Sequence, residues 1–312
     1  MNRMTKFGHG SQTFLYLIFW EYPESKEMDQ ITNRQIGWTI VTLKLILICF
    51  LLITILPELE VADIHLDTTF YQFIIVGFIA QLIDGTLGMA YGVSCSTLLL
   101  NFGIAPRVAT AAVHTAEVFT TGVSGLTHLR FKNIDRKLFL RIVVTGSIGA
   151  MIGAYIISEV LDGNVIKPYI AAYLLVLGIV IITKGIRNRQ KVEKEIKYAE
   201  WLAFIGGLCD AIGGGGWGPI VTSNIIHQGK NPRETIGTVN TAEFFIAFFS
   251  TGVFILIVGV ESWQIVLGLI AGGVIAAPIG AMLTSKINKR VLMISIGIVI
   301  ILSSIFTIYK SL

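Results

Sequence analysis

Long apolar runs separated by short polar loops dominate this sequence. A helix needs about 20 mostly apolar residues to span a bilayer, and most of the runs reach that length. The runs are Trp38–Leu56, Phe70–Leu100, Val108–His128, Leu138–Leu161, Pro168–Ile186, Trp201–Ile226, Thr235–Val258, Ile265–Leu283 and Val291–Ile308. The pattern predicts an all-α, polytopic membrane protein, and we expect it in the cell membrane.

Two of these runs, Phe70–Leu100 and Trp201–Ile226, are interrupted by an acidic residue and glycines. The interruptions are Asp84, Gly85 and Gly88 in the first run, and Asp210, Gly213, Gly214, Gly215 and Gly216 in the second. Glycine inside a helix costs about 1 kcal/mol relative to alanine. An aspartate at mid-membrane costs about 2.5–3.5 kcal/mol. We therefore expect each run to be a pair of half-helices rather than one spanning helix.

The same two runs begin an internal repeat. Asp210 follows Asp84 by 126 positions, and many polar, proline and glycine positions recur at this offset. The further matches are Phe78 with Phe204, Leu82 with Leu208, Gly88 with Gly214, Gly92 with Gly218, Pro106-Arg107 with Pro232-Arg233, and His114-Thr115-Ala116-Glu117 with Asn240-Thr241-Ala242-Glu243. Gly153-Ala154 and Gly280-Ala281 agree after a one-residue insertion. Matches in register are hard to obtain by chance from an apolar composition, so we infer a duplication.

Basic residues gather in three loops, and these loops set the expected orientation. They are Arg130, Lys132, Arg136 and Lys137; Lys184, Arg187, Arg189, Lys191 and Lys194; and Lys286, Lys289 and Arg290. The positive-inside rule places these loops in the cytoplasm, whereas the acidic loop Glu58–Asp67 and the Glu261 loop go outside. Each broken run then enters and leaves on one face, as a re-entrant hairpin, and three spans follow it. Because three is odd, the second repeat is inverted relative to the first, which is typical of transporters.

We expect four parts along the chain. Residues 1–37 form an N-terminal cytoplasmic or interfacial segment without a cleavable signal, and residues 38–69 form an accessory transmembrane helix with its outer loop. Residues 70–197 form the first repeat, and residues 198–312 form the second, inverted repeat. Each repeat is a re-entrant half-helix hairpin plus three transmembrane helices, and the N-terminus is predicted to be cytoplasmic.

The glycine-rich break of the second repeat is the predicted centre of a binding site. A helix N-terminus offers free N–H groups and a partial positive charge, which suits an anion, and glycines let a ligand approach the backbone closely. The alternative is that the glycines only allow helices to cross tightly. The predicted substrate-binding residues are Gly88, Tyr91, Thr115, Gly213, Gly214, Gly215, Gly216, Trp217, Asn240 and Thr241. No Gly-Lys-Ser/Thr sequence follows the glycines, so nucleotide binding is not expected.

Four acidic residues in the apolar runs are candidates for coupling or for a structural role. Asp84 and Asp210 stand at the breaks, where we favour capping of the following half-helix over proton or cation coupling. Glu117 and Glu243 lie deep in their spans, where an acidic residue is a functional candidate by default. Hydrogen bonding to the unwound backbone and proton carriage both stay open for these two glutamates.

Three basic side chains raise the same choice between function and structure. His114 stands opposite Asn240 in the repeat, so it is the titratable group that breaks the symmetry. It is either a proton relay or, as we favour, a hydrogen-bonded core residue. Arg107 and Arg233 each follow a proline at the start of a span, where we favour interfacial anchoring over an electrostatic funnel for anions.

Composition excludes several other classes of protein. Hydrophobic residues make up 54% of the chain and charged residues only 14%, against about 25% charged residues in soluble domains. Cys49, Cys95 and Cys209 lack the spacing of a zinc site or a disulfide framework. We expect no metal, no cofactor and no nucleic acid, and the sequence shows no paired catalytic cluster that would indicate an enzyme.

The residues at the two breaks resemble those of the TauE/SafE family of sulfite exporter-like membrane transporters. The resemblance rests on Asp84-Gly85, Gly88, Tyr91-Gly92, Pro106-Arg107, Asp210, Gly214-Gly215-Gly216-Trp217-Gly218-Pro219 and Asn240-Thr241-Ala242-Glu243. It covers about residues 70–308, and the first break has Thr86-Leu87 and Met89-Ala90 where the second has glycines. The resemblance implies transport of small sulfur-containing or organic anions such as sulfite, thiosulfate and sulfonates, without an ATPase subunit.

Two transport hypotheses follow. The first is a secondary transporter of a small anion, which binds between the re-entrant half-helices near the membrane midplane. The alternative is a cation-coupled carrier or channel that uses Asp84, Asp210, Glu117 and Glu243 as ion ligands. Substrate identity, transport direction, coupling ion and oligomeric state stay open, and a homo-oligomer is compatible with the sequence.

Overall fold

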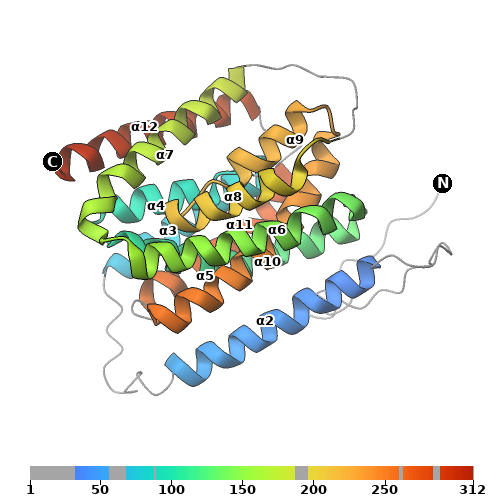
Figure 1. The fold of residues 1–312 in the computed structure, drawn as a ribbon, viewed down its shortest axis with the longest axis horizontal. Helices are drawn as coiled ribbons and strands as arrows, with labels where there is room; N and C mark the ends of the chain where they lie inside the picture. Colours follow the sequence, from blue (N-terminus) through green and yellow to red (C-terminus); the bar gives the residue numbers. More distant parts are fainter. Residues whose placement is uncertain are drawn as a thin grey trace, which may run out of the picture. The chain divides into compact units, whose positions relative to one another are not determined.

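The computed structural model describes residues 32–55, 68–87, 89–186, 196–259, 263–283 and 289–311, and the regular elements in these ranges are all helices (Figure 1). They are α2 (Asn33–Ile55), α3 (Thr68–Leu87), α4 (Tyr91–Asn101), α5 (Pro106–Arg130), α6 (Arg136–Tyr155), α7 (Gly163–Ile186), α8 (Ala199–Gly213), α9 (Ser223–His227), α10 (Pro232–Ile257), α11 (Trp263–Leu283) and α12 (Lys289–Ser311). Two π-helical turns, η1 (Ile156–Val160) and η2 (Gly218–Thr222), extend α6 and precede α9. The all-α prediction is confirmed for the described part of the chain.

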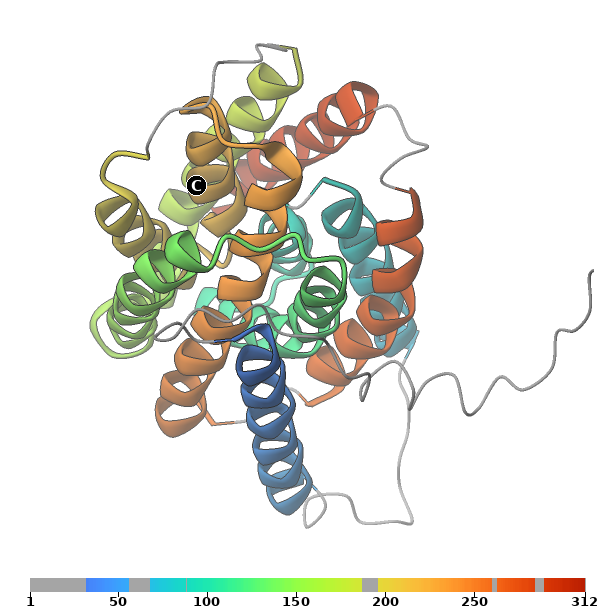
Figure 2. The same cartoon turned by 90° about the vertical axis from the view of Figure 1, so that its right-hand side faces the viewer.

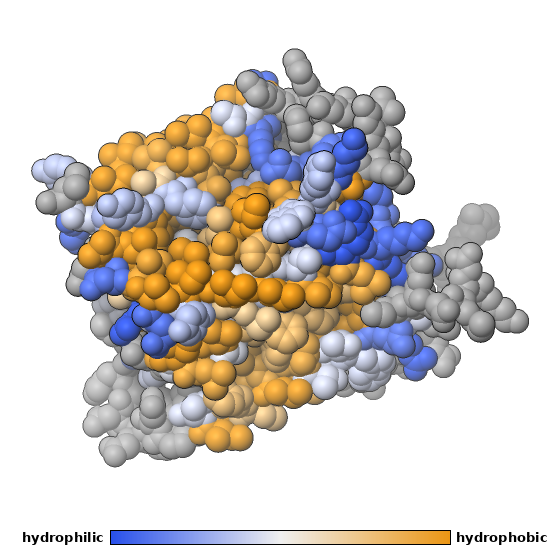
Figure 3. All heavy atoms as spheres, in the orientation of Figure 1, coloured by the Kyte–Doolittle hydropathy of each residue, from blue (hydrophilic) through white to orange (hydrophobic). Residues whose placement is uncertain are grey.

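Seven of the described helices are long and apolar enough to cross a membrane. Their spanning segments are Asn33–Thr54, Thr68–Leu87, Arg136–Val160, Val165–Ile186, Arg233–Ile257, Trp263–Gly280 and Met293–Ser311. Apolar side chains cover the middle of the face shown in Figure 3, and hydrophilic side chains gather mainly toward its right-hand edge. These findings confirm a multi-pass membrane protein.

Helix α5 is too polar to belong to these seven, although it is 25 residues long. Its polar side chains point into the protein: His114, Thr115 and Glu117 are at most 5% exposed. A polar residue inside a membrane protein is tolerated when it faces neighbouring helices instead of lipid. The burial of α5 therefore explains how the least apolar long helix can lie among apolar ones.

Helix α2 begins at Asn33, earlier than the expected start at Trp38. Thr32 and Gln35 form a capping box, in which the Thr32 N–H donates to Gln35 Oε1 at 2.7 Å and the Gln35 N–H donates to Thr32 Oγ1 at 3.2 Å. Such a pair satisfies two of the free N–H groups at a helix start. Figure 2 shows α2 at the edge of the other helices. The preceding residues of the expected segment 1–37, up to Ile31, lie outside the described part of the chain.

Two pairs of helices, α3 with α11 and α6 with α8, run parallel and pack through glycines. The contacts follow one another along both helices: Phe73 with Gly268 and Gly85 with Gly280, and Phe204 with Gly149 and Leu208 with Gly153. A Cβ on Gly149 would lie 2.1 Å from the Phe204 carbonyl oxygen, so a larger residue could not pack there. Each pair joins one helix from residues 70–197 to one from residues 198–312.

Each broken run returns to the end of the bundle from which it starts. In the first run, the rings of Phe73 near the start of α3 and Phe102 after α4 lie 6.3 Å apart. In the second, the Lys197 N–H donates to Gln228 Oε1 at 2.8 Å, which joins the approach to α8 to the residue after α9. Helix α3 has 20 residues, so the break lies nearer the end of the run than expected, and α3 is longer than a half-helix.

The described loops separate into two ends. At one end, Lys230 pairs with Asp135 at 2.7 Å, Arg136 donates to Asn33 at 2.9 Å, and Gly185 packs on Arg290. At the other end, Thr307 donates to Asn101 at 2.5 Å, and Gly163 approaches Pro106. The described basic residues of all three predicted cytoplasmic loops therefore belong to the first end.

Candidate functional site

The two helix breaks meet inside the protein. A Cβ added to Gly215, in the second break, would stand 2.3 Å from the backbone nitrogen of Val93 and 2.6 Å from the carbonyl carbon of Gly92. Cβ atoms do not approach backbone this closely, so Gly215 fits against the start of α4 because it has no side chain. The fold thus brings the two breaks, which the sequence places at matching positions 126 residues apart, into direct contact.

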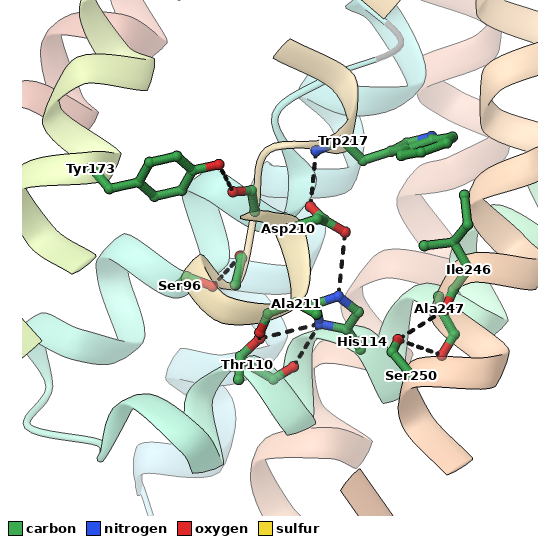
Figure 4. Close-up of polar contacts among 12 residues, drawn as sticks. Ser96, Thr110, His114, Tyr173, Asp210, Ala211, Trp217, Ile246, Ala247 and Ser250 are labelled. Atoms are coloured by element: carbon green, nitrogen blue, oxygen red, sulfur yellow. Dashed lines mark hydrogen bonds and ion pairs between the residues drawn. The ribbon is translucent and has the colours of Figure 1, made fainter. Parts of the chain in front are cut away.

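Asp210 joins the two arms of the second hairpin. Its Oδ1 accepts a hydrogen bond at 2.9 Å from the Trp217 N–H, just before η2 (Figure 4). Asp84 interacts in the same way with the backbone N–H of Tyr91, at the start of α4. A free N–H at a helix start is stabilised by a carboxylate, so this geometry supports the capping role of both aspartates.

His114 lies on the other side of Asp210 and links α5 to α8, helices of the two predicted repeats. Its Nε2 is 3.3 Å from Asp210 Oδ2, and its Nδ1 is 2.9 Å from the Thr110 carbonyl oxygen (Figure 4). The Nδ1–H therefore donates to that carbonyl, which fixes the ring and directs Nε2 at the carboxylate. Thr110 also donates to the Ala211 carbonyl at 2.9 Å. The contact between α5 and the second break is thus made by the polar groups of His114, Thr110 and Asp210. These residues are 0–3% exposed.

Glu117 completes this group from the next turn of α5. One ligand-type atom from each of His114, Glu117 and Asp210 lies within 4.8 Å of the other two, and all three residues are buried. Glu117 Oε1 lies against Gly92, at the start of α4, whereas Oε2 has no hydrogen-bond partner. Among the described residues these three therefore bring a histidine and two carboxyl groups close enough to share a cation.

Two further acids surround this group, and we call the five residues Asp84, His114, Glu117, Asp210 and Glu243 the central cluster. Glu117 interacts electrostatically with Asp84, and Glu243 interacts with the other three acids. All five side chains are at most 8% exposed. The structure therefore gathers the four acids that the sequence singled out, together with the one histidine of the repeat motif.

The glycine cluster of the second break is filled by side chains that sequence reasoning did not identify. The Tyr173 hydroxyl, on α7, donates to the Gly215 carbonyl at 2.9 Å, and the Ser96 hydroxyl, on α4, donates to the Gly214 carbonyl (Figure 4). A Cβ on Gly213 would meet the Tyr173 ring at 2.4 Å, and one on Gly216 would meet its hydroxyl at 2.1 Å. In this conformation the glycines accommodate protein groups, which fits the close-packing alternative.

Trp217 and Tyr91, at matching positions of the repeats, are both fully buried beside glycines. The Trp217 indole is 0% exposed, lies 2.8 Å from a Cβ placed on Gly146, and donates through Nε1 to the Val239 carbonyl at 3.2 Å. The Tyr91 hydroxyl lies 3.6 Å from a Cβ placed on Gly273. Each aromatic side chain therefore closes one break against the neighbouring α6 or α11.

The other predicted substrate-binding residues are engaged with the protein, and Thr115 faces Leu51 and Phe254 rather than the breaks. Thr115 and Thr241 each donate to the carbonyl four residues earlier on their own helices, at 2.7 Å. Asn240 donates to Ser124 Oγ at 3.3 Å, and its Oδ1 has no partner. Gly88 lies outside the described residues.

Several buried polar atoms beside the first break have no hydrogen-bond partner. They include Gln81 Oε1 and Nε2, Asp84 Oδ2, Ser94 Oγ and Glu117 Oε2. Buried polar groups are paired in more than about 90% of cases, and unpaired ones call for a ligand, an ion or water. Gln81 is 0% exposed and was not singled out in the sequence, because a lone glutamine in an apolar run carries no spacing signal.

A basic side chain also lies inside a membrane-spanning segment. Lys44 lies in the middle of α2, and its Nζ is 3.3 Å from the Phe119 carbonyl oxygen, over a notch at Gly122. Its ammonium also stands 5.8 Å from the Phe119 ring centre. Arg107 and Arg233, by contrast, are exposed at the starts of α5 and α10, as interfacial anchors would be. Lys44 therefore docks α2 on the back of α5, away from the central cluster.

Comparison with known proteins gives the chain a family. The model of the family described as "Sulfite exporter TauE/SafE" matches residues 73–307. "Probable membrane transporter protein YtnM" of Bacillus subtilis (strain 168) is 44% identical over 239 residues, which cover 74% of this chain and 79% of that protein. No solved structure matches.

A second relative extends the coverage. "Probable membrane transporter protein YunE" of the same organism is 23% identical over 278 residues, which cover 78% of this chain and 99% of that protein. The family match includes both breaks and the whole central cluster, whereas α2 lies before it. The chain therefore belongs to the sulfite exporter TauE/SafE family of membrane transporters, and it is not an enzyme.

Proposed function

We propose that the chain is a secondary transporter that carries a small anion of the sulfite, thiosulfate or organosulfonate class across the cell membrane. The anion binds where the two breaks meet, near the middle of the membrane. The observation that carries this proposal is the contact of Gly215 with the start of α4. Two broken helices that meet inside a membrane protein leave backbone N–H groups available to a ligand, which lipid-facing helices cannot do.

The arrangement of the ends supports two inverted repeats as the framework. The return of both broken runs to their starting ends favours re-entrant hairpins, one opening to each end of the bundle. Three long helices follow each hairpin, α5 to α7 in the first repeat and α10 to α12 in the second. If the basic end is cytoplasmic, as the positive-inside rule requires, the N-terminal side of α2 is cytoplasmic as well.

The chemistry of the breaks favours an anion of modest size. Helix α4 begins at Tyr91, and the backbone nitrogen of Val93 in its first turn lies beside Gly215 of the second break, so the positive end of the α4 dipole lies there. Tyr173 and Ser96 occupy the glycine-lined space, so binding requires these two hydroxyl groups to release their carbonyl partners and turn to the ligand. Hydroxyl and N–H donors together suit the oxygens of a sulfur oxyanion or a sulfonate.

Binding of ligands by the purified protein tests the site. We expect sulfite, thiosulfate or sulfoacetate to raise the unfolding midpoint. At a ligand concentration one hundred times Kd, the apparent free energy of unfolding should increase by about 2.7 kcal/mol. Gly215→Leu should abolish the shift, because its side chain would collide with Val93. Gly252→Leu is the matched control, since no atom lies within 4 Å of a Cβ at that helical glycine. A ligand-induced rise in the unfolding midpoint that persists in Gly215→Leu would show that the anion binds elsewhere.

The central cluster supports a second candidate, a cation-coupled carrier or channel with Asp84, Asp210, Glu117 and Glu243 as ion ligands. Four buried acids around one place attract cations and repel anions, by about 4 kcal/mol for two charges 4 Å apart at an effective dielectric constant of about 20. This candidate predicts cation flux into liposomes without any anion. Loss of that flux in Asp84→Asn and Glu117→Gln, with the fold intact, would favour it over anion transport.

A further inference from the structure

The central cluster poses a problem for a site that binds an anion. Asp84, Asp210 and Glu243 interact electrostatically with Glu117, and the cluster offers one basic side chain, His114, against four acids. His114 is already paired with Asp210 at 3.3 Å. An ionised carboxyl group without a counter-charge is unstable in a dry interior, where it becomes neutral or binds a cation. An anion can therefore join this cluster only after the remaining acids have been neutralised.

Glu117 is the acid placed to take up that cation. It is 2% exposed, its Oε2 has no hydrogen-bond partner, and it stands with Asp210 and His114 inside a 4.8 Å group. The same side chain touches Gly92 through Oε1, so it borders the place where the two breaks meet. Its charge is therefore felt directly at the proposed anion site.

The titratable groups that face Glu117 come from five of the described helices. Asp84 faces it from α3, Tyr91 and Cys95 from α4, His114 from its own helix, Asp210 from α8 and Glu243 from α10. Lys44, on α2, docks on the Phe119 side of α5 instead. None of the facing groups in this part of the structure gives Glu117 a hydrogen bond at Oε2.

We propose that Glu117, held next to the His114–Asp210 pair, binds the proton that couples anion transport to the proton gradient. The proposal rests on the proposed transport of an anion. In this scheme Asp84 and Glu243 stay neutral throughout, as buried acids without a counter-charge do. With the coupling proton on Glu117 the anion enters; without it the Glu117 charge repels the anion, so anion and proton cross in the same direction. Glu117 Oε2 has no hydrogen-bond partner, so it can bind a proton without breaking an existing contact.

The first test uses wild-type protein in liposomes that contain a pH-sensitive dye, with thiosulfate and then sulfoacetate as the added anion. Inward movement of the anion should acidify the lumen in a fixed ratio to the anion taken up. Uptake without acidification would overturn the proposal. A wild-type protein that moves no anion at all would instead contradict the proposed function, so the two failures are distinguishable.

The second test compares two modes of transport in Glu117→Gln. Exchange of labelled for unlabelled anion needs no net proton movement, so the variant should keep exchange. Its rate of net anion uptake driven by an acidic external medium should fall at least tenfold. Glu200→Gln is the control, because Glu200 is an exposed acid paired with Arg141 at the surface. Gradient-driven uptake at the wild-type rate in Glu117→Gln would overturn the proposal, as would a tightly bound metal ion, present in one copy per chain and lost in His114→Ala.

Discussion

The imidazole Nε2 of His114, in α5, lies 3.3 Å from Oδ2 of Asp210, in α8. Asn240 stands at the position that matches His114 in the internal repeat. A histidine–aspartate contact therefore forms from His114, but its counterpart from Asn240 has no histidine. The pair is at most 4% exposed at its side chains. A buried acid that loses its partner costs more than the pair itself contributes, which makes His114 a sensitive position.

His114→Ala should lower the free energy of unfolding by about 3–5 kcal/mol, because Asp210 keeps its buried charge without a partner. Unfolding in a detergent titration measures this change. His114→Ala combined with Asp210→Asn removes the charge as well, so the double variant should be more stable than His114→Ala alone. Stability of the double variant equal to the sum of the two single losses would contradict coupling between the residues.

Two substitutions of Asp84 separate capping from coupling. Asparagine keeps an acceptor oxygen for the Tyr91 N–H, whereas alanine removes it. If Asp84 acts as a cap, Asp84→Ala should lose about 0.5–2 kcal/mol of stability and Asp84→Asn only a few tenths. Anion exchange measured in both variants completes the test, and loss of exchange in a stable Asp84→Asn protein would assign the residue to coupling.

Cysteine labelling tests the orientation of the two ends. Phe102 and Phe131 flank α5 and are exposed by 47% and 57%, so single cysteines there are accessible in a variant without Cys49, Cys95 and Cys209. We expect an impermeant maleimide added to intact cells to label Phe102→Cys, and Phe131→Cys only after permeabilisation. The opposite pattern would reverse the predicted orientation, and labelling of both from outside would remove α5 as a spanning helix.

Asp135, in the loop before α6, predicts a pH effect on stability. Partial burial raises the pKa of its carboxyl group, but hydrogen bonds from Lys230 and from the Leu138 N–H outweigh this and hold the pKa below its usual value. A folded-state pKa below the unfolded one stabilises the protein above the unfolded value of about 3.9, and this stabilisation is lost as the pH falls through the folded value.

Asp135→Asn is the matched variant for this effect, since asparagine still caps α6 while the charge is gone. The wild type should exceed the variant in stability by up to about 1 kcal/mol at pH 7, and the difference should disappear as the pH falls through the lowered folded-state pKa of Asp135. Unfolding midpoints of both proteins across this range measure it. A difference that grows toward low pH would contradict the assigned role of the Lys230–Asp135 pair.

The sequence predicted much of the framework because its signals are periodic or repeated. Run lengths identified most of the helices, and the matched aspartates marked both breaks. The exact position of the first break was missed, since α3 continues through Asp84 and Gly85, and Gly85 packs on Gly280 of α11. A helical contact of this kind depends on a partner far away in the chain, and no local pattern reveals it.

The site was predictable in part for the same reason. The motif at His114 and Glu117 stood out through the repeat, but the pairing of His114 with Asp210 exists only after the repeats interlock. Ser96 could have been found, because Thr222 matches it at the repeat offset. Tyr173 and Lys44 carry no repeat or spacing signal. The residue that matches Tyr173 in the second half is of an unrelated type, and Lys44 lies in α2, outside the predicted repeats.

Uptake of labelled thiosulfate, sulfite and sulfoacetate into liposomes tests the central claim most directly. In an acidic external medium without ATP, the wild type should accumulate at least one of these anions with saturable kinetics. Gly252→Leu should do the same. Gly215→Leu, whose side chain separates the two breaks, should match empty liposomes. No uptake of any of the three anions by the wild type under any imposed ion gradient would contradict anion transport through the meeting point of the breaks.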